Sequence, residues 1–334
     1  MGTANYFNYK VFSGGPELEQ FLTPCGNGLH SSPTVLGLFA DMKPAPFRYV
    51  AARTLEQALQ LKAEFGEDAR FLAGGQSLVP TMNFRLTQPA ILIDINPLDG
   101  LAGVRNGGDR LTIGALTRYR SLERDPATVR HLPLIHEALP HIAHPQIRNR
   151  GTIGGNLAHA DPASEMPAIV LALAGRLRAQ STKGERWIDA ADFFVGALTT
   201  ALDPDEMLTE VELPTVPPRS GACFMEVSRR RGDFAIIGVA CTVRLDADGR
   251  CREARIGLCN AGDGPVFAEQ AAKSLAGRRL GVKEIAEAAE LVQGAIDPGG
   301  SIHASKEFQR HIAGVLTARA LATANKRARS ADAA

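Results

Sequence analysis

Residues 70–86 read RFLAGGQSLVPTMNFRL, in which a short apolar run stops at two adjacent glycines. The run is typical of a buried strand, and Gly74 and Gly75 follow it directly. Glycine allows backbone conformations and close approaches that a Cβ atom would prevent. Such a turn can present main-chain N–H groups to a ligand, although many glycine turns serve the chain alone. This stretch by itself predicts a strand and a turn.

The bulk composition describes a globular protein of about two domains, because the chain has 334 residues. Its 37 basic and 36 acidic residues leave a formal charge of +1, which argues against a polyanionic partner such as nucleic acid. No apolar run reaches the ~18 residues that a membrane span needs, and the first residues lack the pattern of a signal peptide. We therefore expect a cytoplasmic protein without a membrane span.

The cysteines do not follow a cofactor pattern. The chain has five, and no two have the short spacing of metal or iron–sulfur knuckles. We predict that the chain itself carries no metal or cluster. Cys241 and Cys259 lie in apolar strand patterns and are predicted to be small buried residues.

The N-terminal half begins with residues 1–41, which are rich in Gly, Pro, Ser and Asn and are expected to form a loosely ordered extension or to precede the true start at Met42. Thr54 and Gln57 form a capping-box pattern for a helix that should end at Gly66. Further elements are expected as strands at residues 90–95 and 111–116, a helix at 133–143, and a buried helix at the apolar end of 144–175.

The C-terminal part has a different character. A proline-rich stretch at residues 214–221 predicts a linker, with a domain boundary near residue 218. Residues 222–262 are expected to form a meander of β-strands, and the stretches 282–294 and 305–324 are expected to be helices. The resulting division is a first domain of residues 42–217, a second of residues 218–325, and a frayed tail of residues 326–334.

A second glycine turn lies about eighty residues after the first, in RNRGTIGGN at residues 148–156. Gly154 and Gly155 again permit close main-chain approach, while Thr152 and Asn156 offer side-chain hydrogen bonds. Two such loops can hold a pyrophosphate from both sides. Neither matches the Rossmann pattern G-x-G-x-x-G or a phosphate loop ending in Gly-Lys-Ser/Thr.

Four segments together resemble a known family. They are AGGQSLVPTM at 73–82, RNRGTIGGNLAHADPASEMPA at 148–168, RRRGDFA at 229–235 and IGLCNAG at 256–262. The sequence resembles the FAD-binding subunit of the xanthine dehydrogenase family of molybdenum hydroxylases, and especially the medium subunit of enzymes of the aerobic carbon monoxide dehydrogenase type. The resemblance covers about residues 42–325.

The resemblance implies an α+β fold. A two-lobed FAD-binding domain of the vanillyl-alcohol-oxidase (PCMH) type would precede a smaller domain with an antiparallel sheet and helices. It also implies a set of cofactor-binding residues. The first pyrophosphate loop would be Leu72, Ala73, Gly74, Gly75, Gln76 and Ser77, the second would be Thr152, Gly154, Gly155 and Asn156, and His159, Asp161, Glu165 and Phe224 would lie near the cofactor.

The sequence departs from the family pattern at three places. Glu165 stands where an aspartate commonly contacts the ribityl chain, and its side chain is one methylene longer. Phe224 stands where a tyrosine is common, and it could stack on a ring but not donate a hydrogen bond. Residues 82–85 read MNFR where relatives usually read MKLR, so a lysine is missing.

By the resemblance, the chain would bind FAD non-covalently and carry no catalytic residue or metal of its own. Its partners would be a large molybdopterin-binding subunit and a small [2Fe-2S] subunit, in a heterotrimer or a dimer of heterotrimers. Electrons would pass from the partner's clusters through FAD to an external acceptor. Two alternatives stay open: a self-sufficient flavin oxidase, and a non-catalytic assembly subunit on the same fold.

Overall fold

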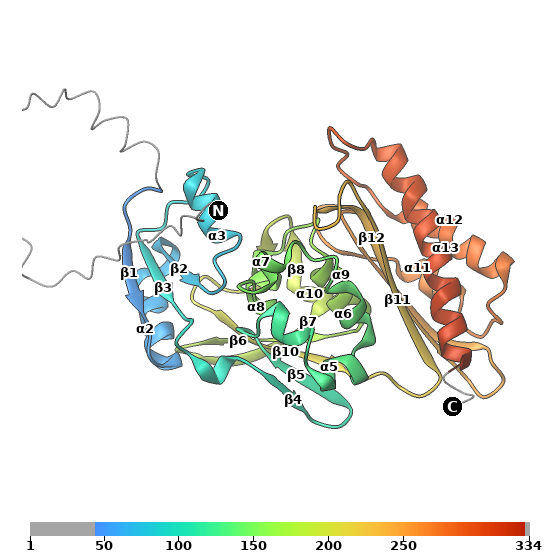
Figure 1. Ribbon diagram of the computed structural model, residues 1–334, viewed down its shortest axis with the longest axis horizontal. Helices are drawn as coiled ribbons and strands as arrows, with labels where there is room; N and C mark the ends of the chain where they lie inside the picture. Colours follow the sequence, from blue (N-terminus) through green and yellow to red (C-terminus); the bar gives the residue numbers. More distant parts are fainter. Residues whose placement is uncertain (1–43, 331–334) are drawn as a thin grey trace, which may run out of the picture.

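The computed structural model describes residues 44–330 of the chain, and the predicted extension of residues 1–41 lies outside them. Three sheets follow one another along the sequence, each covered by helices (Figure 1). A short hairpin of two strands supplements them.

The first sheet is a small parallel one with the strand order β1-β3-β2. Its elements are β1 (Arg48–Ala51), α2 (Leu55–Phe65), η2 (Gly66–Asp68), β2 (Ala69–Leu72), α3 (Leu78–Asn83), β3 (Ile91–Asp94) and η3 (Asp99–Leu101). The predicted cap of α2 is present, because the Thr54 side chain accepts a hydrogen bond from the Gln57 N–H. Gly66 ends the helix with a positive φ, as expected for a glycine C-cap.

The second sheet is antiparallel, with the order β4-β5-β10-β6-β7. Helices lie above it in the view of Figure 1. The strands are β4 (Val104–Asn106), β5 (Arg110–Gly114), β6 (Arg176–Ser181), β7 (Gly184–Asp189) and β10 (Met207–Pro214), and the hairpin is β8 (Phe194–Gly196) with β9 (Thr199–Thr200). The helices are α4 (Tyr119–Leu122), α5 (Pro126–His131), α6 (Pro133–Ala138), α7 (Pro145–Arg148), α8 (Ile153–His159), α9 (Glu165–Ala172) and α10 (Ala190–Phe193).

The third sheet is the expected antiparallel meander. Its elements are β11 (Ser220–Ser228), β12 (Ala235–Leu245), β13 (Cys251–Cys259), β14 (Val266–Phe267), α11 (Glu269–Ser274), α12 (Val282–Ala295) and α13 (Lys306–Ser330). One face of this sheet packs against α13, and the other faces the helices of the second sheet (Figure 1). Ala222, Phe224 and Ala240 belong to the core of the second sheet. The hydrophobic core is therefore continuous across the predicted linker.

Two helices end at other residues than predicted. Helix α6 stops at Ala138 instead of continuing to residue 143, because Pro140 has no N–H to continue the helical hydrogen bonds. Helix α13 continues to Ser330, so the prediction of a frayed tail is wrong for residues 326–330. Ala328 is fully buried there, and Arg327 donates to a Glu137 carboxylate oxygen at 2.5 Å. No helix within residues 44–330 is long and apolar enough to cross a membrane.

Candidate functional site

The first glycine loop joins β2 to α3 and touches the second loop along the backbone. A Cβ atom at Gly74 would lie 2.5 Å from the Arg150 carbonyl oxygen and 2.9 Å from the Cα of Gly151. Gly75 has a φ of +71°, a conformation that L side chains rarely adopt. Gly74 is thus required by contact with a segment more than seventy residues away, and Gly75 by its own backbone conformation.

The second glycine loop begins helix α8. Thr152 caps this helix by accepting a hydrogen bond from the Gly155 N–H at 3.1 Å. A Cβ atom at Gly154 would lie 2.4 Å from the Ala115 side chain. This glycine therefore allows α8 to pack closely against the residue that follows β5. Gly155 is exposed, and a Cβ atom there would come within 3.8 Å of the Ala73 side chain. The two loops therefore face each other across a narrow space.

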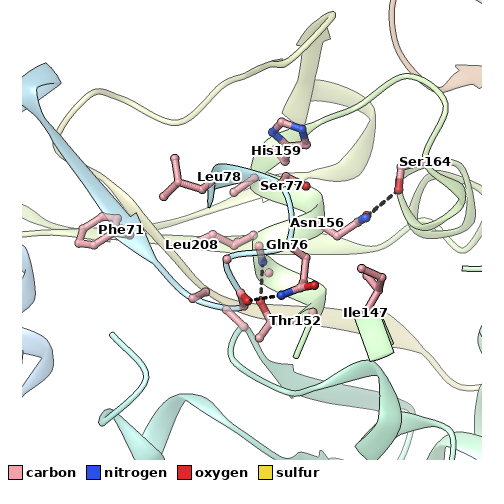
Figure 2. A pocket seen from close by; sticks show the side chains of 18 of the residues that line it. Phe71, Gln76, Ser77, Leu78, Ile147, Thr152, Asn156, His159, Ser164 and Leu208 are labelled. Carbon is pink, nitrogen blue, oxygen red and sulfur yellow. Dashed lines mark hydrogen bonds between the residues drawn. The ribbon is translucent and has the colours of Figure 1, made fainter. Parts of the chain in front are cut away.

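This space opens into a cavity of about 710 Å³, which lies in the range of small-molecule and cofactor sites. Figure 2 shows side chains from both loops converging on it. Most of the predicted binding residues line the cavity: Ala73, Gly74, Gly75, Gln76, Ser77, Thr152, Gly154, Gly155, Asn156, His159 and Glu165.

Two polar side chains of the loops already have partners. The Asn156 amide and the Ser164 hydroxyl are hydrogen-bonded at 2.8 and 2.9 Å, as Figure 2 shows. Gln76 donates from Nε2 to the Gly74 carbonyl oxygen at 3.0 Å. These bonds shape the loops, so the main chain, rather than the Asn156 and Gln76 amides, is the part of the loops best suited to meet a ligand.

The structure does not bring three of the predicted residues to the cavity wall. Leu72 lies in β2, and its carbonyl oxygen accepts from Ile95 N and the Asn96 amide. Asp161 accepts from the Ala163 N–H at 2.9 Å and so shapes the turn before α9. Phe224 is 3% exposed and packs edge-on against the ring of His141, because alternate residues of β11 face the central core.

Three exposed apolar side chains at the cavity were missed from the sequence. Leu86, Leu198 and Phe234 line it while 78%, 59% and 65% exposed, respectively. They come from the segment after α3, the β8–β9 hairpin and the segment between β11 and β12. Of these three residues, only Phe234 could have been suspected from the sequence, since it lies in the GDFA motif that resembles the family. The other two are ordinary loop leucines whose position depends on the tertiary structure.

A polar cluster links the two glycine loops. Asn96 donates from Nδ2 to the Leu72 and Ala73 carbonyl oxygens at 3.2 and 2.9 Å. Arg118 donates to Asn96 Oδ1 and also to the Arg150 carbonyl oxygen. The guanidinium thus connects the end of β2 with the start of the second loop. Asp94, the last residue of β3, accepts from the Asn96 N–H at 2.9 Å and so helps to position Asn96.

We expect Arg118→Ala to weaken FAD binding about tenfold to a hundredfold, because hydrogen bonds from a charged donor contribute about 1.5–3 kcal/mol each. The change leaves Asn96 Oδ1 and the Arg150 carbonyl without this donor, so the distance between the two glycine loops is no longer held by the guanidinium. The dissociation constant is measured by quenching of flavin fluorescence. Arg124→Ala is the control, since Arg124 is exposed on the surface nearby. Equal affinities of both variants would show that the cluster does not set the loop spacing.

The rear wall of the cavity carries buried ionisable groups. Glu165, the first residue of α9, is 4% exposed, and burial raises its pKa to about 8. Burial also raises the pKa of Tyr119 well above its usual value, and its hydroxyl has no hydrogen-bond partner within residues 44–330. A neutral Glu165 can donate a hydrogen bond to a ligand, which an ionised carboxylate cannot.

These features fit a flavin dinucleotide. Glycines that accept no Cβ atom border a slot between two backbone loops, which suits a pyrophosphate. The adjoining wall is largely apolar, with few polar groups, and suits an aromatic ring system. Within residues 44–330, no three His, Cys, Asp or Glu side chains come together to hold a metal ion.

Comparisons with known proteins agree with this geometry. The family model described as "FAD binding domain in molybdopterin dehydrogenase" matches residues 45–216, and "CO dehydrogenase flavoprotein C-terminal domain" matches residues 222–324. The chain is 44% identical over 288 residues to the 6-hydroxypseudooxynicotine dehydrogenase complex subunit alpha of Paenarthrobacter nicotinovorans, covering 86% of this chain and 97% of that protein. It is 36% identical to the carbon monoxide dehydrogenase medium chain of Afipia carboxidovorans, covering 86% and 100%.

Among solved structures, carbon monoxide dehydrogenase from Hydrogenophaga pseudoflava superposes with a TM-score of 0.84. The sequence identity is 34%, and the match covers 86% of this chain and 99% of the other.

Proposed function

Because the chain belongs to the family of FAD-binding subunits of molybdopterin dehydrogenases, we propose that it is the FAD-binding electron-transfer subunit of a multi-subunit molybdenum hydroxylase. The observation that carries this proposal is the backbone contact between the two glycine loops at the mouth of a cofactor-sized cavity. In the proposed assembly this chain joins a large molybdenum-binding subunit and a small iron–sulfur subunit, which agrees with its similarity to a carbon monoxide dehydrogenase medium chain. Molybdenum and [2Fe-2S] cofactors belong to those partners.

When bound, FAD supplies two-electron and one-electron redox chemistry, so it can exchange electrons with iron–sulfur clusters and with an external acceptor. This chain's residues position the cofactor. We propose that the main chain of residues 73–77 and 152–156 holds the pyrophosphate and that His159 and Glu165 lie along the rest of the molecule. The hydrogen bonds of Asn96 and Arg118 hold the two loops at a fixed distance from each other.

We place the boundary between the FAD-binding domain (42–217) and the C-terminal domain in the segment between β10 and β11. The C-terminal domain, predicted as residues 218–325, extends to the end of α13 at Ser330. We also propose a cytoplasmic location. All four cysteines within residues 44–330 are free and buried, which suits a reducing compartment.

The purified full-length chain is expected to contain about one non-covalent FAD and no iron, since the paired loops border one cavity of cofactor size within residues 44–330. Cofactor released by heat or acid is identified by chromatography, and iron is measured by elemental analysis. A chain that cannot be reconstituted with FAD would refute the proposal and favour an assembly subunit. Flavin reduction by an organic substrate without partner subunits would instead indicate a self-sufficient oxidase.

A further inference from the structure

A buried acidic cluster lies behind the cavity and connects it with the surface. Glu165 lines the cavity and is 4% exposed. The Glu226 side chain on β11 is 2% exposed, and its Oε1 lies 3.2 Å from Nδ1 of His141. The His141 side chain is 37% exposed and therefore reaches solvent. The cluster thus has one member at the cavity wall and another at the surface of the protein.

The sheet is closely packed beside Glu226. This residue pairs with Gly238 on β12, which in turn pairs with Cys259 on β13. A Cβ atom at Gly238 would lie 2.6 Å from the Cys259 sulfur and 3.5 Å from the Glu226 Cβ. The Glu226 Oε2 atom is buried and has no hydrogen-bond partner within residues 44–330. Burying such an oxygen costs free energy unless it carries a proton or forms a hydrogen bond with a polar molecule.

The proposed function creates a need for protons at this place. Full reduction of a flavin consumes two electrons and two protons, whereas iron–sulfur clusters deliver electrons alone. Protons for the cavity must therefore come from solvent. Glu165 lines the cavity, Glu226 pairs with the surface histidine His141, and the charges of Glu226 and His141 both act on the pKa of Glu165.

Resting on that function, we propose that His141, Glu226 and Glu165 form a route that carries protons between solvent and the FAD cavity. A proton taken up by the imidazole passes from Nδ1 to Oε1 of Glu226, and the carboxyl group hands a proton from Oε2 to Glu165. Glu165 releases it into the cavity. Each group then returns to its starting state, so one proton is moved for each cycle and no bond other than to hydrogen changes.

The surroundings shift the pKa values of His141 and Glu165. The hydrogen bond to Glu226 raises the pKa of His141, and Arg231 opposes this effect. Burial raises the pKa of Glu165, and Glu226 and Asp161 act in the same direction while His141 opposes them. The remaining neighbours are the Tyr119 hydroxyl, the buried Cys259 thiol, and Arg148, which donates to the carbonyl oxygens of Ile142 and Ala143.

The test uses the full-length chain loaded with FAD. The bound flavin is photoreduced in weakly buffered solution, and a pH-indicator dye follows proton uptake while absorbance follows reduction. His141→Gln, Glu226→Gln and Glu165→Gln are each compared with His136→Gln, an exposed histidine on α6. Flavin content is measured first, so a chain that holds no FAD counts against the proposed function and not against the route.

We expect proton uptake to slow at least about tenfold in the three cluster variants, because an acid–base group in a proton transfer commonly contributes 10²–10⁴-fold. The His136 variant should behave as wild type, and added imidazole should restore the rate of His141→Gln. Uptake at the wild-type rate in flavin-loaded His141→Gln and Glu226→Gln would overturn the route. Equal slowing in His136→Gln would also overturn it, since the effect would then not depend on the cluster.

Discussion

Gly74→Ala is expected to abolish stoichiometric FAD binding. The new methyl group would lie 2.5 Å from the Arg150 carbonyl oxygen and 2.9 Å from the Cα of Gly151, so the backbone of one loop has to move. Gly74 has no positive φ, and its intolerance therefore comes from this contact alone. Such overpacking costs about 1–3 kcal/mol, and here it widens the slot between the loops. The ratio of flavin to protein absorbance after gel filtration measures the loss.

Two further variants separate this effect from general damage. Gly100→Ala is the matched control, because no atom lies within 4 Å of a Cβ atom at that position, and it should retain full flavin. Gly155→Ala places a methyl group 3.8 Å from the Ala73 side chain and 2.8 Å from the Thr152 hydroxyl, so the side chain that caps α8 has to shift. This variant should fold and still lose FAD. Full flavin occupancy in both Gly74→Ala and Gly155→Ala would show that the slot does not hold the cofactor.

The FAD-free chain is expected to lose stability as the pH rises from about 5 to 8. Burial raises the pKa of Glu165 from its ordinary value of 4.5 to about 8 in the folded chain. Between these values the folded state keeps a proton that the unfolded state has lost, so raising the pH favours unfolding. Since each pKa unit corresponds to about 1.4 kcal/mol, the total effect is on the order of 4 kcal/mol. The pKa of His141 is also raised in the folded chain, so the free energy of unfolding decreases further as the pH rises above the ordinary pKa of histidine.

Urea unfolding of the full-length chain at several pH values measures this dependence. Glu165→Gln should flatten most of the slope, because the amide stays neutral throughout the range. Glu64→Gln, at an exposed position on α2, should leave the slope unchanged. A wild-type stability that is constant between pH 5 and 8 would mean that Glu165 is ionised in the folded protein.

Much of the fold could be predicted because its signals are local. The cap at Thr54, the stop at Gly66 and the meander of the third sheet depend on residues close together in sequence, and the structure confirms them. The ends of α6 and α13 were predicted less well. Helix α6 ends before Pro140, which has no backbone N–H to donate. The C-terminal end of α13 is stabilised by the burial of Ala328 and by the ion pair between Arg327 and Glu137. The latter partners are 190 residues apart.

The sequence by itself determined the nature of the site, because the motifs of both glycine loops are contiguous and resemble one family. It also showed the neutral charge and the lack of cysteine ligand spacing. Only the tertiary structure decided which residues share the cavity. It directs Phe224 into the core, since side chains alternate along β11, and brings Leu86, Leu198 and Phe234 to the cavity from three separate segments. Tertiary structure also makes the Asn96–Arg118 link and the Glu226–His141 pair, whose members are far apart in the chain. Burial in the folded chain raises the pKa of Glu165. A short sequence motif contains no information about such packing and burial.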